Sequence, residues 1–342
     1  MKGRMGFLGL TALLGGALAC TALALGGGLP DVQPTLRGDL NIHDPTVLRL
    51  PGGYVAMGTG YEGIDAGTLR LKTSADGVTW ADAGHLGNTQ PAWVAKVLGE
   101  TPPNLWAPSL YQRGSVTYLY YSASTFGKNT SGIGLMTHAK LDPKRPSVGW
   151  VDRGLVLSSK AGDSFNAIDP ARLDTADGRA WLAYGSWWDG IRLRELDPVG
   201  GLVKPGTSEI RLASRGGRAI EAPSLVQHGG YTYLFVSFDR CCAGLSSTYQ
   251  IMVGRSRSVT GPYLDRAGRS LLEGGGTEIQ ASKGRFVGPG GQEMFRTARG
   301  DALAYHFYDG DQGGTPILQT SPIVWGADGW PTLPALPLGE TP

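Results

Sequence analysis

Three acidic residues stand at matching points of the sequence, beside prolines and among apolar neighbours. Asp44 and Asp169 each directly precede a proline, and Glu221 stands one residue ahead of that position in the segment IEAPS. One Asp-Pro pair is a common turn dipeptide and by itself indicates only a turn. Three acids at one place in related segments indicate instead that their carboxyl groups converge on a single pocket.

Converging carboxyl groups suit the hydrolysis of a glycosidic bond. One carboxylic acid protonates the leaving oxygen, and a second carboxylate acts on the anomeric side. Where the two lie roughly 6.5–9.5 Å apart, a water molecule fits between them and the reaction inverts the anomeric centre. A third acid raises the pKa of its neighbour, so that a glutamic acid stays protonated near neutral pH. The alternative for three clustered acids is a site for a divalent cation.

An internal repeat brings these distant acids to equivalent positions. Five segments each open with a Pro-containing turn, continue through a short strand and a polar turn, and end in an apolar strand, which is the pattern of a β-hairpin. These segments begin at His43, Trp106, Ile168, Glu221 and Gly288. Their prolines are Pro45, Pro108, Pro170 and Pro223, with Pro289 taken as the fifth.

Each repeat, with its connections, spans about 60 residues, which is long enough for the four short strands of one propeller blade. The sequence therefore predicts an all-β fold, a five-bladed β-propeller. In this architecture the equivalent turns meet at one mouth of the central channel. Outside the N-terminal segment, no long stretch carries the 3.6-residue apolar period of a helix, so helix should be scarce.

The chain begins with a segment that is typical of export. Lys2 and Arg4 are followed by a long apolar run that ends in small residues, which predicts a signal peptide over residues 1–24. An uncleaved membrane anchor or a lipoprotein modified at Cys20 is the alternative. We divide the rest into a short linker, residues 25–37, and a single catalytic propeller, residues 38–342. We expect a secreted protein, extracellular or periplasmic, with no stable membrane association after signal cleavage.

The composition limits the class of partner. The formal net charge is +2 and only 18% of residues are charged, so we expect no nucleic-acid partner, whereas a neutral polysaccharide is compatible. The three cysteines include the adjacent pair Cys241 and Cys242, so no disulfide framework supports the fold. Stability must come from a hydrophobic core, for which the length is ample.

From about Gly38 to Gly326 the sequence resembles the endo-1,5-α-L-arabinanases of glycoside hydrolase family 43. The motifs that carry the resemblance are HDP at 43–45, NLWAPS at 104–109, FNAIDP at 165–170, YGSWWDGI at 184–191 and IEAPS at 220–224. The resemblance implies a five-bladed propeller and a reaction that inverts the anomeric centre. By the same resemblance Asp44 is the general base, Glu221 is the general acid, and Asp169 tunes the pKa of the donor and orients the substrate.

The resemblance also implies four residues that contact the substrate: Trp106, Asn166, Ser186 and Trp187. Trp106 stands beside the predicted pocket, where its ring could stack under an arabinose or could pack within its blade. Both readings stay open from the sequence alone. For Trp181, we expect blade packing.

The sequence departs from the family at one place that bears on metal binding. Arabinanases commonly have a His after a GPG turn that helps to hold an ion in the central channel, and here Gly291 stands at that point. We therefore expect that no metal is required, with calcium as the open alternative. His306 is expected to be a hydrogen-bonded core residue. The Cys241–Cys242 pair matches a pair in relatives, and we expect a structural role, as a vicinal disulfide or as two buried thiols.

The function predicted from these features is an inverting glycoside hydrolase that cuts internal α-1,5-L-arabinofuranosidic bonds of arabinan or arabino-oligosaccharides. The alternatives are an exo-acting α-L-arabinofuranosidase or β-xylosidase of the same family, and a non-catalytic sugar-binding propeller. The retaining propellers that cleave fructans are disfavoured. They have a Glu-Cys motif, whereas Glu221 precedes Ala222.

Overall fold

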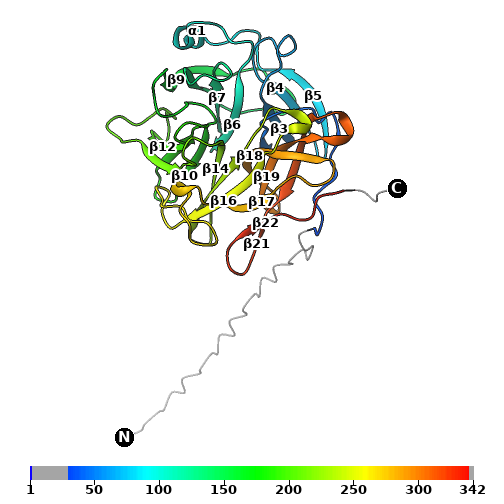
Figure 1. Cartoon of the computed structure of the whole chain (residues 1–342), viewed down its shortest axis with the longest axis vertical. Helices are drawn as coiled ribbons and strands as arrows, with labels where there is room; N and C mark the ends of the chain where they lie inside the picture. The colour runs from blue at the N-terminus through cyan, green and yellow to red at the C-terminus, as the bar shows by residue number, and fades with distance from the viewer. Residues whose placement is uncertain (2–29, 339–342) are drawn as a thin grey trace.

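The computed structural model describes Met1 and residues 30–338. Five antiparallel sheets follow one another around a central axis in chain order, so the predicted all-β, five-bladed propeller is confirmed (Figure 1). The predicted signal peptide, apart from Met1, lies outside the described residues. No helix within the described residues has both the length and the apolar character needed to span a bilayer.

Each blade is one sheet, and its strands are numbered from the axis outward. Blade 1 contains β2 (Thr46–Leu50), β3 (Gly53–Gly58), β4 (Arg70–Ser74) and β5 (Thr79–His85), with β1 (Arg37–Gly38) parallel to β5. Blade 2 contains β6 (Trp106–Arg113), β7 (Val116–Ala123), β8 (Ser131–His138) and β9 (Val151–Ser159), and blade 3 contains β10 (Ala171–Asp174), β11 (Ala180–Tyr184), β12 (Ile191–Leu196) and β13 (Ile210–Ala213). Blade 4 contains β14 (Ile220–His228), β15 (Tyr231–Phe238), β16 (Gln250–Ser256) and β17 (Thr277–Gln280), and blade 5 contains β18 (Phe286–Thr297), β19 (Gly300–Asp309) and β20 (Thr315–Pro322).

Little of the described chain lies outside the blades. A small sheet of β21 (Val324–Trp325) and β22 (Pro331–Thr332) follows blade 5. Within the described residues, helix is limited to α1 (Ala92–Leu98) and three short 3-10 turns, as the absence of a helical period predicts.

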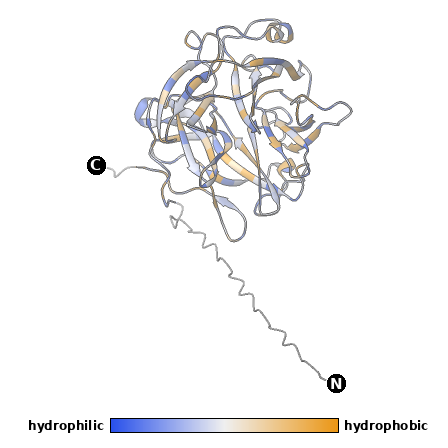
Figure 2. Cartoon of the chain, turned by 180° about the vertical axis from the view of Figure 1, so that it is seen from behind, coloured by the Kyte–Doolittle hydropathy of each residue, from blue (hydrophilic) through white to orange (hydrophobic). Residues whose placement is uncertain are grey.

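The hydrophobic core is divided among the interfaces between neighbouring blades. Val55 and Met57 of β3 pack with Leu119 and Tyr121 of β7, and comparable clusters of buried residues join each of the other four pairs of neighbours. Trp181 lies in the cluster between blades 3 and 4, which confirms its packing role. Apolar residues are accordingly concentrated along the strands (Figure 2). Because each sheet buries both faces, the blades hold one another in place around the axis.

The N-terminal segment completes the last blade. The backbone N–H of Ile42 donates to Pro316 at 3.1 Å, and the N–H of Leu318 donates to Leu40 at 2.8 Å, so residues 40–42 lie beside β20. Farther upstream, within the segment expected as a linker, Gln33 is buried and its amide nitrogen donates to the backbone oxygen of Pro334 at 3.0 Å. The two ends of the propeller are therefore joined by backbone and side-chain hydrogen bonds.

Five equivalent residues, one from each blade, surround the axis at one mouth of the channel. All have a left-handed backbone, with φ of 49° at Asp44, 36° at Ala107, 57° at Asp169, 50° at Ala222 and 59° at Gly291. We call these five residues the axial ring. In blades 2, 4 and 5, the register of the first two strands shifts at this point, which is the geometry of a β-bulge. The bulge turns one residue of each inner strand toward the axis.

The fifth member of the axial ring differs from the predicted one. Gly290 pairs with His306 and Glu293 pairs with Ala304, so the bulge of blade 5 falls at Gly291 and Gln292. The prediction that Pro289 marks the equivalent position was wrong. Blade 5 has Gln292 where the other blades have proline. Aligning blade 5 with the other repeats by its proline therefore places its bulge at the wrong residues.

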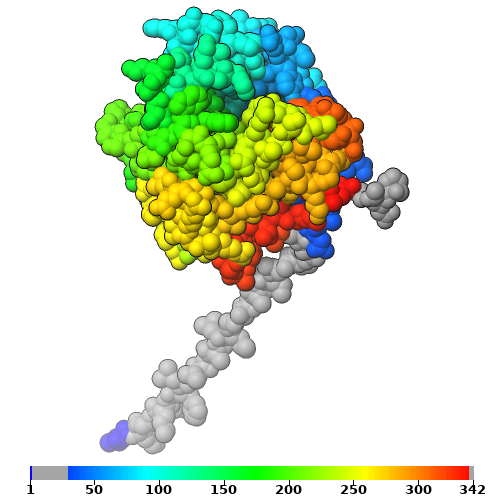
Figure 3. Space-filling model, in the orientation of Figure 1, coloured from blue at the N-terminus to red at the C-terminus, as the bar shows by residue number. Residues whose placement is uncertain are grey.

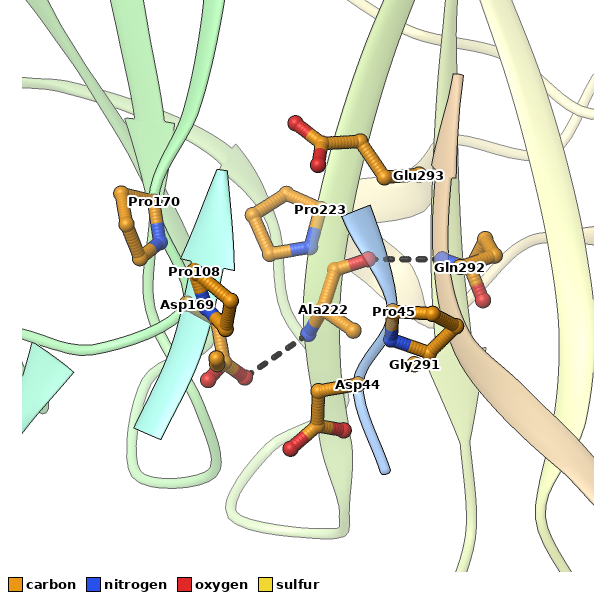
Figure 4. Close-up of a pocket in the computed structure, with 11 residues that line it drawn as sticks. Asp44, Pro45, Pro108, Asp169, Pro170, Ala222, Pro223, Gly291, Gln292 and Glu293 are labelled. Atoms are coloured by element: carbon orange, nitrogen blue, oxygen red, sulfur yellow. Dashed lines mark hydrogen bonds between the residues drawn. The ribbon is translucent and has the colours of Figure 1, made fainter. Parts of the chain in front are cut away.

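The register of blade 5 also places a carboxyl group in the channel. Glu293, Asp44 and Asp169 line an axial cavity of about 30 Å³. Glu293 points toward one end of this cavity and the two aspartates toward the other (Figure 4). One oxygen of Glu293 accepts a hydrogen bond from Ser109, while Oε2 has no partner among the described residues. No Lys or Arg is among the residues that line the cavity. Burial therefore raises the pKa of Glu293 to about 8.

This raised pKa predicts that the stability of the fold declines with rising pH. The folded protein retains the proton of Glu293 up to about pH 8, whereas the unfolded chain loses it near pH 4.5, so the free energy of unfolding falls between these values. Glu293→Gln imitates the protonated form and should remove this part of the decline, on the order of 3–5 kcal/mol. Urea unfolding of both proteins from pH 5 to 9 measures the difference.

The exposed Glu278 of β17 provides a matched control, because Glu278→Gln also removes one carboxylate from the same protein. This control should keep the wild-type pH dependence. Parallel pH profiles for Glu293→Gln and the wild type would contradict a buried, protonated Glu293.

Candidate active site

Hydrogen bonds between neighbouring blades fix the axial ring. In four of the five positions, the backbone N–H of the ring residue donates to a side chain near the end of the second strand of the preceding blade or just beyond it. These bonds run from Ala107 to Thr59 Oγ1 (2.9 Å), from Asp169 to Ser122 Oγ (3.0 Å), from Gly291 to Ser237 Oγ (3.1 Å) and from Asp44 to His306 Nδ1 (3.1 Å). Each blade therefore positions the ring residue of the next.

Blade 3 departs from this pattern, and the departure orients Asp169. Gly185 stands where the other blades have a hydroxyl or an imidazole, so it offers no side-chain acceptor to Ala222. The N–H of Ala222 donates instead to Oδ2 of Asp169 at 3.0 Å (Figure 4). A Cβ added to Gly185 would lie 2.4 Å from the backbone oxygen of Gly190, so no larger residue fits here without movement. The Asp169 carboxylate is thus held by the backbone of blade 4.

Asp44 is held as an anion. Its Oδ2 accepts from Thr59 Oγ1 at 2.7 Å and lies 2.8 Å from His43 Nδ1. Burial alone would raise the pKa of Asp44, but the charge and the hydrogen bond of His43 outweigh it and, with the hydrogen bond from Thr59, lower the pKa to about 2. An ionised carboxylate in this position can accept a proton from water.

Two imidazole rings lie beside the Asp44 carboxylate. The rings of His43 and His306 stack with centroids 3.8 Å apart. Burial would lower the pKa of His43, but the adjacent Asp44 charge raises it. Burial and the nearby His43 lower the pKa of His306 well below its usual range, so this residue is neutral. His306 is fully buried and hydrogen-bonded, as predicted.

Glu221 and Asp169 have the opposite electrostatic character. Burial raises the pKa of Glu221, and the Asp44 charge adds to this effect. Burial together with the charges of Glu221 and Asp44 raises the pKa of Asp169 well above its usual range. The site therefore combines an ionised acid with a pair of acids that tends to retain a proton, which is the requirement for general acid–base chemistry.

Glu221 and Asp169 each have one carboxyl oxygen that accepts a hydrogen bond. Oε2 of Glu221 accepts from Ser186 Oγ at 2.6 Å, while Oε1 has no hydrogen-bond partner within residues 30–338. Asp169 likewise uses Oδ2 to accept from the backbone N–H of Ala222. Glu221 and Asp169 are therefore the two candidates for a proton donor.

All three acids open into one large cleft of about 1040 Å³ above the mouth of the channel. Segments from all five blades contribute to its walls, and the surface is hollowed where these segments meet (Figure 3). The residues predicted to contact substrate, Trp106, Asn166, Ser186 and Trp187, all line this cleft. A cleft of this volume accommodates several sugar units rather than a single one.

The four residues differ in how they are held. Ser186 donates to Glu221, and Asn166 is buried and accepts from Ser131 Oγ at 2.6 Å. Trp187 has a left-handed backbone with φ of 54° and its side chain is 42% exposed. A large exposed aromatic ring at the rim of a cleft is suited to stacking on a sugar. Trp106, at the start of β6, is half-buried.

The sequence did not point to several other residues of this site. Tyr249 and Tyr308 line the cleft beside the acids, and both are supplied by segments far from the acidic motifs. Cys241 and Cys242 also line it and form a disulfide, which decides between the two predicted states. Cys242 is exposed rather than buried. The sequence singled out this pair by its adjacency and its match in relatives, but did not place it in the cleft.

Three residues near the axis are the candidate ligands for an ion. His43, Asp44 and His306 offer ligand atoms within 4.8 Å of one another. However, Nδ1 of His306 already accepts from the Asp44 backbone, and the group includes a single carboxylate. Calcium requires six to eight oxygen ligands. This set therefore does not fit the ion, and no step of the reaction is assigned to a metal.

Comparison with known proteins agrees with this geometry. The family described as "Glycosyl hydrolases family 43" matches residues 33–331. An extracellular endo-α-(1→5)-L-arabinanase of Bacillus subtilis is 41% identical over 293 residues, covering 85% of this chain and 87% of the relative. An extracellular exo-α-(1→5)-L-arabinofuranosidase of Cellvibrio japonicus is 36% identical, covering 92% and 90%.

Solved structures give the same result. The α-L-arabinanase of Cellvibrio cellulosa complexed with arabinohexaose superimposes with a TM-score of 0.79 at 34% identity, covering 86% of this chain and 95% of that one. The family match spans most of the chain, and the three acids lie together at the mouth of a five-bladed propeller. The chain therefore belongs to glycoside hydrolase family 43.

Proposed function

We propose that this enzyme hydrolyses internal α-1,5-L-arabinofuranosidic bonds of arabinan and inverts the anomeric centre. The observation that carries the proposal is the electrostatic contrast between Asp44, whose pKa is lowered to about 2, and Glu221, whose pKa is raised, on blades 1 and 4 of the same cleft. Relatives named for endo-acting arabinanase activity support the substrate.

In this mechanism Glu221, whose pKa is raised by burial and by the charge of Asp44, protonates the leaving oxygen. Asp44 removes a proton from a water molecule that attacks the anomeric carbon from the opposite side. Asp169 keeps the pKa of Glu221 high through its proximity and helps to orient the sugar. We assign substrate contacts to Trp106, Asn166, Ser186 and Trp187, with the two tryptophans as stacking surfaces.

The proposal extends to cofactor and location. The reaction needs no metal, because acid and base are both supplied by side chains and the residues at the axis do not fit calcium. Relatives named as extracellular support secretion through the N-terminal segment. This is also the location of a polymeric substrate that cannot enter a cell.

Incubation with linear arabinan in the presence of EDTA tests the function and the cofactor assignment together. An endo-acting enzyme should release a ladder of oligosaccharides from the start, because the cleft binds the interior of a chain. Release of one short product alone would favour the exo-acting alternative.

NMR of the earliest product should give the β-anomer. An α-anomer would mean that Asp44 is a nucleophile, and loss of activity with EDTA would mean that a metal is needed.

Glu221→Gln tests the donor. Gln cannot supply a proton, so kcat on arabinan should fall roughly 10²–10⁴-fold. KM should change little, because the amide keeps the hydrogen bond from Ser186. On an aryl arabinoside whose leaving group needs no proton, the variant should recover much of the wild-type rate. An equal loss on both substrates would contradict the assignment.

A further inference from the structure

A chain of hydrogen bonds runs from Asp44 to the opposite wall of the cleft. His43 Nδ1 lies 2.8 Å from the Asp44 carboxylate, and His43 Nε2 lies 2.8 Å from the hydroxyl of Tyr308. The same hydroxyl accepts from the backbone N–H of Cys242 at 2.7 Å. These groups come from blade 1, from β19 of blade 5 and from the connection between β15 and β16. Tyr308 and the backbone N–H of Cys242 have no part in the acid–base steps described above.

The order of the donors fixes the proton on His43. The Asp44 carboxylate only accepts, so Nδ1 of His43 must carry a proton toward it. The N–H of Cys242 occupies one lone pair of Tyr308, which leaves the Tyr308 proton free to be donated to Nε2 of neutral His43. If His43 is charged, the second lone pair of Tyr308 accepts from Nε2 instead. In both states the bond to Tyr308 holds the imidazole ring in the orientation that serves Asp44.

The Cys241–Cys242 disulfide determines the direction of the Cys242 N–H. Cys242 has a left-handed backbone, with φ of 61°, which a residue with a side chain rarely adopts. The surrounding loop is tied at both ends, by Thr248 N–H to Arg240 at 2.9 Å and by Ala243 N–H to Ser247 Oγ at 3.0 Å. The covalent link between adjacent residues keeps the peptide in this conformation. The two hydrogen bonds tie the loop on either side of the pair, and the disulfide adds the covalent restraint at Cys242 itself.

We propose that the Cys241–Cys242 disulfide and Tyr308 form a positioning unit for the catalytic base, acting through His43. This inference rests on the proposed function, in which Asp44 activates water. Loss of the unit should leave the protein folded and able to bind substrate, but should let His43 turn away and Asp44 lose its alignment. A base displaced by a fraction of an ångström to 1 Å slows the reaction without weakening binding.

Tyr308→Phe is the first test, because it keeps the ring and removes only the hydroxyl. kcat on arabinan should fall about 10–100-fold, with KM within about twofold of the wild type. The loss should be the same on an activated aryl arabinoside, since the water must be activated for either leaving group. Tyr305→Phe is the matched control. Tyr305 lies on the same strand and donates to Gln33 at 2.7 Å, away from the cleft, so kcat should be unchanged.

Reduction of the disulfide is the second test, since Cys242 is exposed. Two electrons and two protons pass from dithiothreitol, which closes to its own cyclic disulfide, and leave two thiols that a thiol reagent can count. kcat should fall as in Tyr308→Phe and should return on reoxidation. A Cys241→Ser, Cys242→Ser double variant should have the same low kcat and should not respond to dithiothreitol. Adding Tyr308→Phe to the double-serine variant should lower kcat little further, because both changes disrupt the same positioning unit.

The imidazole ¹⁵N shifts of His43 give a readout that does not depend on activity. The wild type should show the proton fixed on Nδ1, whereas Tyr308→Phe and the reduced protein should show a mixture of tautomers. Wild-type kcat in Tyr308→Phe or in the double-serine variant would overturn the positioning unit, and so would a loss confined to KM, which would indicate a substrate contact. Failure of the wild type to cleave arabinan would instead overturn the proposed function and leave the NMR test of the unit in place.

Discussion

The architecture depends on the left-handed backbone at the axial ring. Four of its five residues carry a side chain, and each such residue costs of order 1–3 kcal/mol relative to an ordinary conformation. The hydrogen bond that each ring residue receives or gives across the blade boundary offsets that cost. Because every bond joins one blade to the next, the same contacts that hold the ring together also aim Asp44 and Asp169 at the cleft. The geometry of the acids therefore depends on the same hydrogen bonds that close the ring of blades.

Burial raises the pKa of all three acids, and the groups around each carboxyl decide whether that effect is overcome. Asp44 is surrounded by donors from Thr59 and His43, so its anion is stabilised despite burial. Glu221 has a single donor, Ser186, and faces the charge of Asp44. The opposite directions of these two pKa shifts therefore follow from the donors and charges around each carboxyl group. They do not follow from the identity of Asp or Glu.

Much of this could be predicted from the sequence, and the failures have specific causes. The repeat places Asp44, Asp169 and Glu221 together because propeller topology carries equivalent turns to one mouth. The register of blade 5 could not be read from its proline, because Gln292 replaces the proline that marks the bulge elsewhere. Glu293 was therefore not recognised as an axial residue. The contacts of Tyr308 with His43 and Cys242 join residues that no local pattern relates, so only the closed ring brings them together.

The pairing of residues 40–42 with β20 governs the order in which the fold can be completed. The hydrogen bond from Gln33 to Pro334 spans 301 positions of the chain, so the first segment of the propeller to leave the ribosome has no partner until the last blade is made. Blades 1 to 4 can form locally during synthesis, whereas blade 5 remains one strand short. In a chain that crosses a membrane N-terminus first, the closing strand would wait on the far side for its partner. Secretion and ring closure would then end in the same event, and the active cleft would come into existence only outside the cell.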